Sequence, residues 1–207
     1  IDNNSTGKET LEILKNLTCN IIKLNRNDGH KVWRNNPEIW NGLPEYFIIT
    51  DPDLEFNKDL PNNFIEIMKE ISDKYNAGRV GFALKIENEP LYSYTGYIGS
   101  GTIKEWEFQY WNKPLEKYKN IDLYRAAIDT TFFLGCKSRF NNTHIRVASN
   151  FTAKHLPFYP DHNKSLGKER LLEMYGTSKS STTAKFILRH LKELENGGLG
   201  QTGGTNR

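Results

Sequence analysis

Two aspartates that flank a single proline, Asp51 and Asp53, follow a strongly β-prone run at residues 46–50 (YFIIT). Carboxylates placed where a buried strand leaves its sheet repel each other unless a cation or several hydrogen-bond donors hold them. Carboxylate oxygens suit Mn²⁺ or Mg²⁺, which leave coordination positions open for phosphate oxygens. Pro52 fixes its own φ and favours an extended Asp51, which presets the acidic pair. The triplet predicts a metal site that faces a diphosphate, with an ordinary type I turn as the alternative.

A single acidic residue, Asp129, lies in an apolar and β-branched run (AAIDTTFFLG). A charge is unfavourable among such neighbours unless it has a function, and a partly desolvated carboxylate is a competent general base for a hydroxyl nucleophile. We therefore expect Asp129 to be a partly buried catalytic base. The alternative is an aspartate that caps a helix or closes a turn through its neighbouring threonines.

His155 follows a strand-like run and precedes two prolines (HLPFYP). Neutral imidazole is a good third ligand for Mn²⁺ and a poor one for Mg²⁺. His155 is therefore a candidate third metal ligand beside Asp51 and Asp53. The alternative is a structural histidine, which is the more common role for a histidine that stands alone.

Several short polar clusters could line a nucleotide crevice at the same edge of the sheet. Asp2 and Asn4 end the first strand-like segment, where Asp2 could accept a hydrogen bond from a nucleobase N–H. Asn27 and Gly29 follow the next strand, and Arg34 brings positive charge to a loop that would face the diphosphate. Clusters of Asn, Asp and Gly are also ordinary turns, so this alternative stays open.

Two tryptophans, Trp106 and Trp111, lie five residues apart in the aromatic segment KEWEFQYW. Each could stack on a sugar or fill the core, and we expect one of them in each role. Glu105 and Glu107, on either side of Trp106, are the next candidates for a general base after Asp129.

The elements that would position these residues alternate along the first half of the chain. Apolar spacing predicts helices at residues 8–17, 61–75 and 183–195 and strands at 20–25, 46–50, 79–86, 127–135 and 144–149. The order strand, helix, strand, helix, strand predicts an α/β fold with a mainly parallel sheet, flanked by helices and followed by a more mixed second half. The ligand crevice of such a sheet lies at the carboxyl ends of its strands, where Asp51 and Asp53 fall.

Length and composition predict one domain at residues 1–195, followed by a flexible tail at 196–207 that has no core-forming residues. The formal net charge of +3 is too small to predict a nucleic-acid partner. Cys19 and Cys136 match no metal or redox spacing, which favours a reduced, cytoplasmic setting over a disulfide. No 18-residue apolar run occurs, so we expect no transmembrane segment.

Taken together, five motifs in order along most of the chain resemble those of a GT-A glycosyltransferase. They are IDNNST at residues 1–6, NRNDG at 25–29, TDPD at 50–53, IDTTF at 128–132 and KHLPFY at 154–159. Chains with such TDPD, IDTTF and KHLPFY segments occur in bacteria and large viruses. Members of this family begin with a strand and a helix before the segment that resembles IDNNST. The resemblance therefore implies that the sequence starts inside the domain.

The resemblance implies a Rossmann-type fold and a metal-dependent, inverting transfer of a sugar from a nucleoside diphosphate sugar, most simply a UDP-sugar. The acceptor would be a hydroxyl of a glycan or glycoconjugate. Asp53, with Asp51 directly or through water, would hold Mn²⁺ or Mg²⁺ against the diphosphate, and Asp129 would take the proton of the acceptor. The alternatives are a sugar-1-phosphate nucleotidyltransferase and a carbohydrate-binding module without catalysis.

Overall fold

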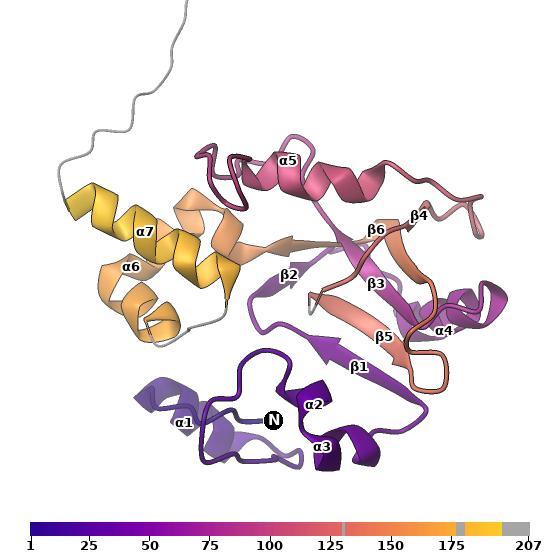
Figure 1. Ribbon diagram of the computed structural model, residues 1–207, viewed down its shortest axis with the longest axis horizontal. Coiled ribbons are helices and arrows are strands. Elements are labelled where there is room, and N and C mark those ends of the chain that lie inside the picture. The colour runs from indigo at the N-terminus through magenta and orange to yellow at the C-terminus, as the bar shows by residue number, and fades with distance from the viewer. Residues whose placement is uncertain (130, 177–180, 196–207) are drawn as a thin grey trace, which may run out of the picture.

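The protein, described from a computed structural model, has an α/β fold in which helices flank an open, mixed sheet of six strands (Figure 1). The structure describes residues 1–129, 131–176 and 181–195. The predicted flexible tail at 196–207 lies outside these ranges.

The six strands lie in an order that the sequence does not suggest. They are β1 (Tyr46–Thr50), β2 (Leu54–Phe56), β3 (Arg79–Leu84), β4 (Leu123–Arg125), β5 (Phe132–Cys136) and β6 (His144–His155). The order in the sheet is β1-β5-β3-β6-β2, with β4 also paired to β6. Only β3 and β6 pair in parallel among these strands, whereas β5 inserts between β1 and β3 and runs opposite to both. The prediction of a mainly parallel sheet is therefore not confirmed.

The predicted helices are present, with others between them. The helices are α1 (Lys8–Asn16), α2 (Val32–Asn35), α3 (Pro37–Gly42), α4 (Phe64–Lys74), α5 (Ile103–Phe108), α6 (Pro160–Tyr175) and α7 (Thr182–Glu195), with 3₁₀ turns at Gln109–Trp111 and Leu156–Phe158. The strand predicted at 20–25 is reduced to one isolated parallel bridge between Asp2 and Lys23. The segment before α2 therefore stands outside the six-stranded sheet.

Side chains that alternate along the strands build two apolar clusters. On β5, Phe132 packs with Phe82 of β3 at 4.4 Å between ring centroids, in a cluster that α4, α5, α6 and α7 complete. The next residue, Phe133, belongs to the other cluster with Trp33 of α2 and Phe47 of β1. Because successive side chains of a strand point to opposite faces, both faces of the sheet are covered. This rigid sheet carries the loops described next.

Candidate active site

Pairing between β2 and β6 brings the acidic loop to His155. Asp51, Pro52 and Asp53 connect the end of β1 to the start of β2, and Leu54 of β2 lies opposite His155 in the antiparallel ladder. The backbone fixes both ends of the loop, because Asp51 N–H donates to Thr131 O at 3.0 Å and Leu156 N–H donates to Asp53 O at 2.9 Å. His155 is thus placed beside Asp53 by strand register.

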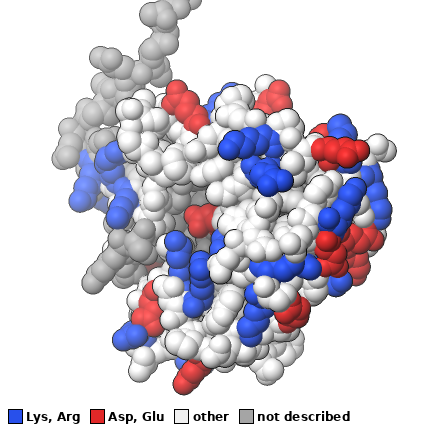
Figure 2. Space-filling model, turned by 45° about the vertical axis from the view of Figure 1, so that its right-hand side comes forward, with Lys and Arg blue, Asp and Glu red and all other residues white. Residues whose placement is uncertain are grey.

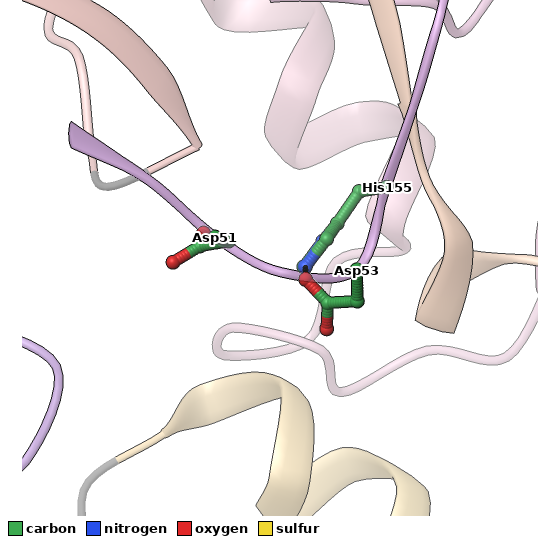
Figure 3. Close-up of side chains that lie close together, drawn as sticks. All are labelled: Asp51, Asp53 and His155. Atoms are coloured by element: carbon green, nitrogen blue, oxygen red, sulfur yellow. Dashed lines mark ion pairs between the residues drawn. The ribbon is translucent and has the colours of Figure 1, made fainter. Parts of the chain in front are cut away.

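Asp51, Asp53 and His155 form a candidate metal centre, with one ligand atom from each within 4.8 Å of the others. Figure 3 shows the Asp53 carboxylate and the His155 imidazole directed toward one another, while Asp51 extends from the same loop on the other side. Nε2 of His155 lies 3.4 Å from Oδ1 of Asp53, and the Tyr175 hydroxyl donates to Oδ2 at 3.5 Å. Both contacts are long, which leaves the carboxylate weakly bonded.

Asp53 and His155 shift each other's pKa. Burial acts to raise the pKa of Asp53, but His155, the backbone N–H of Asp53 and the Tyr175 hydroxyl together outweigh it, and the pKa of Asp53 is lowered. Burial acts in the opposite sense on His155, but Asp53 and then Asp51 raise the pKa of this imidazole. Each group therefore favours the charged form of its neighbour.

The residues present fit a divalent cation. Oδ1 of Asp53 is buried and has no well-formed hydrogen bond among the described residues, since its ion-pair partner, Nε2 of His155, lies 3.4 Å away. This is an unfavourable state for a carboxylate oxygen unless another group satisfies it. Two carboxylates and one imidazole are a donor set that suits Mn²⁺. The side chains of Asp53 and His155 are 19% and 13% exposed, so an ion between them would still be open to a ligand on one side.

The cluster opens into a cavity of about 420 Å³ that the predicted base also lines. The predicted residues on its wall are Asp51, Asp53, Asp129, His155, Trp106 and Glu107. Figure 2 shows an acidic side chain in a hollow near the middle of one face, where basic and acidic groups are otherwise interspersed. Residues that lie far apart in the sequence therefore share one hollow.

The prediction that Asp129 is partly buried is not confirmed, because this residue is exposed at the cavity. The reason is that β5 begins only at Phe132, so Asp129 lies in the loop that precedes the strand. A carboxylate in this position is accessible to a hydroxyl group that enters the cavity.

The two tryptophans have different surroundings in the structure, and so do the two glutamates. Trp106 lines the cavity, whereas Trp111 packs on Tyr124 with 5.1 Å between the ring centroids. Glu105 accepts from the backbone N–H of Thr102 at 2.7 Å and completes the capping box of α5, which is a structural role. Glu107 is buried on the cavity wall.

A buried ion pair that the sequence reasoning did not assign lies on the same wall. Arg146 of β6 donates from Nη1 to Oε2 of Glu107 at 3.0 Å and from Nε to Ala127 O at 2.9 Å. The guanidinium also lies 4.0 Å from the ring centroid of Tyr110. Burial raises the pKa of Glu107 against the opposing effect of Arg146. A charge within the apolar strand HIRVAS was the signal that could have pointed to Arg146.

Of the six residues predicted to bind the nucleotide, Asp51 lines this cavity. The other five do not line it in the described part of the chain: Asp2, Asn4, Asn27, Gly29 and Arg34. Hydrogen bonds from Ser5 lower the pKa of Asp2, and its carboxylate accepts from Ser5 N–H at 2.9 Å. Asn27 accepts from Gly29 N–H at 2.9 Å and from Asn3 at 3.0 Å. The bonds from Ser5 and Gly29 are those of local turns, whereas the bond from Asn3 joins two segments that lie 24 positions apart.

The remaining two predicted nucleotide-binding positions have different surroundings. Asn4 has a φ of 66°, in the left-handed region that asparagine tolerates. The Arg34 guanidinium lies 5.1 Å from the ring centroid of Phe140. The neighbouring loop residue His30 does line the cavity, so this loop borders the site at one point.

Comparison with known proteins assigns no family to this chain. No family model, no curated protein and no solved structure matches this chain. Among the described residues, no helix has the length and apolar content needed to cross a membrane.

Proposed function

We propose that this chain is a metal-dependent glycosyltransferase of the GT-A type that moves a sugar from a nucleoside diphosphate sugar, in the first instance a UDP-sugar, to an acceptor hydroxyl. One observation carries the proposal: a cavity of about 420 Å³ is lined by Asp51, Asp53 and His155 together with Asp129 and Trp106. The first three residues offer metal ligands, the fourth an exposed carboxylate and the fifth an aromatic surface for a sugar.

In this proposal Asp51, Asp53 and His155 hold the ion against the donor diphosphate. A bound Mn²⁺ or Mg²⁺ would supply Lewis-acid chemistry, since it offsets the charge of the departing diphosphate. The buried Oδ1 of Asp53 supports this role, because it has no well-formed hydrogen bond among the described residues and its ion-pair partner at 3.4 Å, Nε2 of His155, is itself a candidate ligand.

Asp129 is the general base of the proposed reaction. Its carboxylate accepts the proton of the acceptor hydroxyl as that oxygen bonds to the anomeric carbon. The bond between the anomeric carbon and the diphosphate oxygen breaks, and the diphosphate leaves on the opposite side. This in-line displacement inverts the configuration of the sugar. Exposure of Asp129 at the cavity supports the role, because the acceptor must reach it.

The acceptor in this proposal is a hydroxyl of a glycan or glycoconjugate, which Trp106 would contact through its ring. The loop that carries Asn27 and Gly29 borders the cavity at His30, and we assign it to the nucleotide side of the donor. The same proposal places the reaction in the cytoplasm, which the free thiols of Cys19 and Cys136 support.

Thermal denaturation with a panel of nucleotide sugars, UDP and GDP tests this proposal. A diphosphate should stabilise the protein in the presence of Mn²⁺ and not in excess chelator, by about 2.7 kcal/mol when its concentration is about 100 times Kd. Asp53→Ala should abolish the effect. Asp59→Ala is the matched control, because Asp59 is an exposed aspartate outside the cavity wall. Equal stabilisation with and without the metal would contradict the proposal.

A further inference from the structure

The backbone around Asp129 is held by two arginine side chains and by one backbone amide, from three separate parts of the chain. Ala127 O accepts from Nε of Arg146 at 2.9 Å, and Ile128 O accepts from Nη1 of Arg79 at 3.3 Å. On the other side, Thr131 O accepts from Asp51 N–H at 3.0 Å. Two consecutive carbonyls before the carboxylate and one after it are therefore fixed by hydrogen bonds.

The two arginines are themselves supported. Arg146 and Glu107 are each 5% exposed and pair at 3.0 Å, so the guanidinium is held by a carboxylate that has little access to water. The capping box at Thr102 and Glu105 fixes the first turn of the short helix that carries Glu107. Arg79 is held differently, since its guanidinium lies 4.0 Å from the ring centroid of Phe140.

A buried ion pair is weak support for the stability of a fold, because the loss of hydration offsets much of the attraction between the charges. The position of this pair indicates another use. Glu107 and Arg146 both line the cavity, and Arg146 reaches the carbonyl two residues before Asp129. A displacement of about 1 Å at a catalytic group can reduce a rate by about 100-fold.

We infer that Arg146, held by Glu107 and assisted by Arg79, is a positioning residue that fixes the segment 127–129 and so aims the Asp129 carboxylate into the cavity. The catalytic part of this inference depends on the proposed function. The positional part does not, since it concerns only how tightly the segment is held. The link through Thr131 to Asp51 would keep the base and the metal loop in register.

Arg146→Lys is the sharpest perturbation, because it keeps the positive charge beside Glu107 but loses the planar fork that bonds Glu107 and Ala127 O together. Glu107→Gln is the second variant, and it keeps the size of the side chain while removing its charge. Arg139→Lys is the matched control. Arg139 bonds Tyr46, Ser72 and Asp73 at 2.9, 3.1 and 2.7 Å, away from the cavity wall.

¹⁵N relaxation of the backbone amides at 127–129 tests the positional part without any substrate. We expect the order parameters of these amides to fall from about 0.85 to below about 0.6 in Arg146→Lys, at temperatures where both variants are folded, and to stay within about 0.1 of the wild type in Arg139→Lys. Unchanged order parameters in Arg146→Lys would overturn the inference.

Kinetics with a UDP-sugar and Mn²⁺ test the catalytic part. Turnover should fall about 10- to 100-fold in Arg146→Lys and in Glu107→Gln, with the UDP–Mn²⁺ affinity within about twofold of wild type. In an Asp129→Asn background the Arg146→Lys loss should shrink to less than about twofold, because both changes act on one group. A loss of UDP–Mn²⁺ affinity, or a full additional loss of turnover in that background, would overturn the positioning role.

The two proposals fail in distinguishable ways. If the wild type transfers no sugar from any nucleotide sugar, the proposed function fails, and the order parameters alone then decide whether Arg146 fixes the segment. If the wild type is active and Arg146→Lys turns over at the wild-type rate, the proposed function stands and the positioning role is wrong.

Discussion

Replacement of His144 should change how the stability of the protein depends on pH. His144 is the first residue of β6 and lies on the sheet near Arg79, which contacts the segment before the predicted base. Burial, then the positive charges of Arg79 and Arg34, lower the pKa of His144 to about 4, from an ordinary value of 6.5. The folded protein therefore keeps this imidazole neutral over a range in which the unfolded chain binds a proton.

The sign and the size of the His144 contribution to folding stability follow from the difference in its pKa between the folded and unfolded states. Above pH 6.5 both states are neutral at this position, so His144 adds nothing to the pH dependence. As the pH falls from 6.5 to about 4, only the unfolded state takes up the proton, and the folded state loses stability. The full difference in pKa corresponds to about 3 kcal/mol, which solvent screening of the partly exposed ring reduces to about 1–2 kcal/mol.

Urea unfolding at a series of pH values measures this effect as a difference between wild type and His144→Gln. Between about pH 7 and about pH 4, the wild type should lose about 1–2 kcal/mol more stability than the variant. Asn141→Gln is the control, since Asn141 is an exposed neutral residue shortly before β6 and its replacement removes no titratable group. Parallel curves for wild type and His144→Gln would refute the reasoning.

Three further predictions concern the metal cluster, the cavity wall and the core. His155→Ala should lose about tenfold more activity with limiting Mn²⁺ than with saturating Mg²⁺, because imidazole favours Mn²⁺; an unchanged metal preference returns His155 to a structural role. Trp106→Ala should raise the KM of a glycan acceptor about tenfold with less change in turnover. Phe82→Ala should lower the free energy of unfolding by about 3–5 kcal/mol, since Phe82 is 1% exposed, whereas Phe108→Ala, at a 58% exposed position, should change it by less than about 1 kcal/mol.

The acidic loop could be predicted from the sequence because its signal is local. The β-prone run predicts a strand, and Asp51, Pro52 and Asp53 predict a loop directly after it. The structure has both the strand and the loop. His155 was predicted as a third ligand from residue chemistry alone. What places it next to Asp53 is the ladder between β2 and β6, which the predicted elements did not include because β2 has only three residues.

The sheet order could not be predicted, since pairing between distant strands depends on tertiary packing. The alternation of helices and strands in the first half suggested parallel neighbours, but β5 from the second half occupies the place between β1 and β3.

The nucleotide-binding role predicted for the residues around Asp2 and Asn27 could not be decided from the sequence for a different reason. Asn and Gly clusters satisfy their own backbone through short-range hydrogen bonds, so the same residues suit a turn or a ligand site.

The ion pair of Glu107 and Arg146 shows what the sequence reasoning missed. The two residues are separated by 39 positions, and neither belongs to a recognisable spacing pattern. Both residues are buried. In the sequence, the only signs of this burial are that Arg146 lies within an apolar strand and that Glu107 lies within an aromatic helix. Their partner, the carbonyl of Ala127, carries no side-chain signal at all.

Release of UDP from a panel of UDP-sugars tests the central claim most directly. The wild type should release UDP with Mn²⁺ and stop when the metal is chelated, and Asp129→Asn should bind UDP–Mn²⁺ with wild-type affinity while its turnover falls by about 10² to 10⁴. A structural Asp129 would instead lower stability by about 1 kcal/mol and leave the rate of the folded protein nearly intact. Turnover of Asp129→Asn at the wild-type rate, or UDP release by the wild type that persists in excess chelator, would contradict the account.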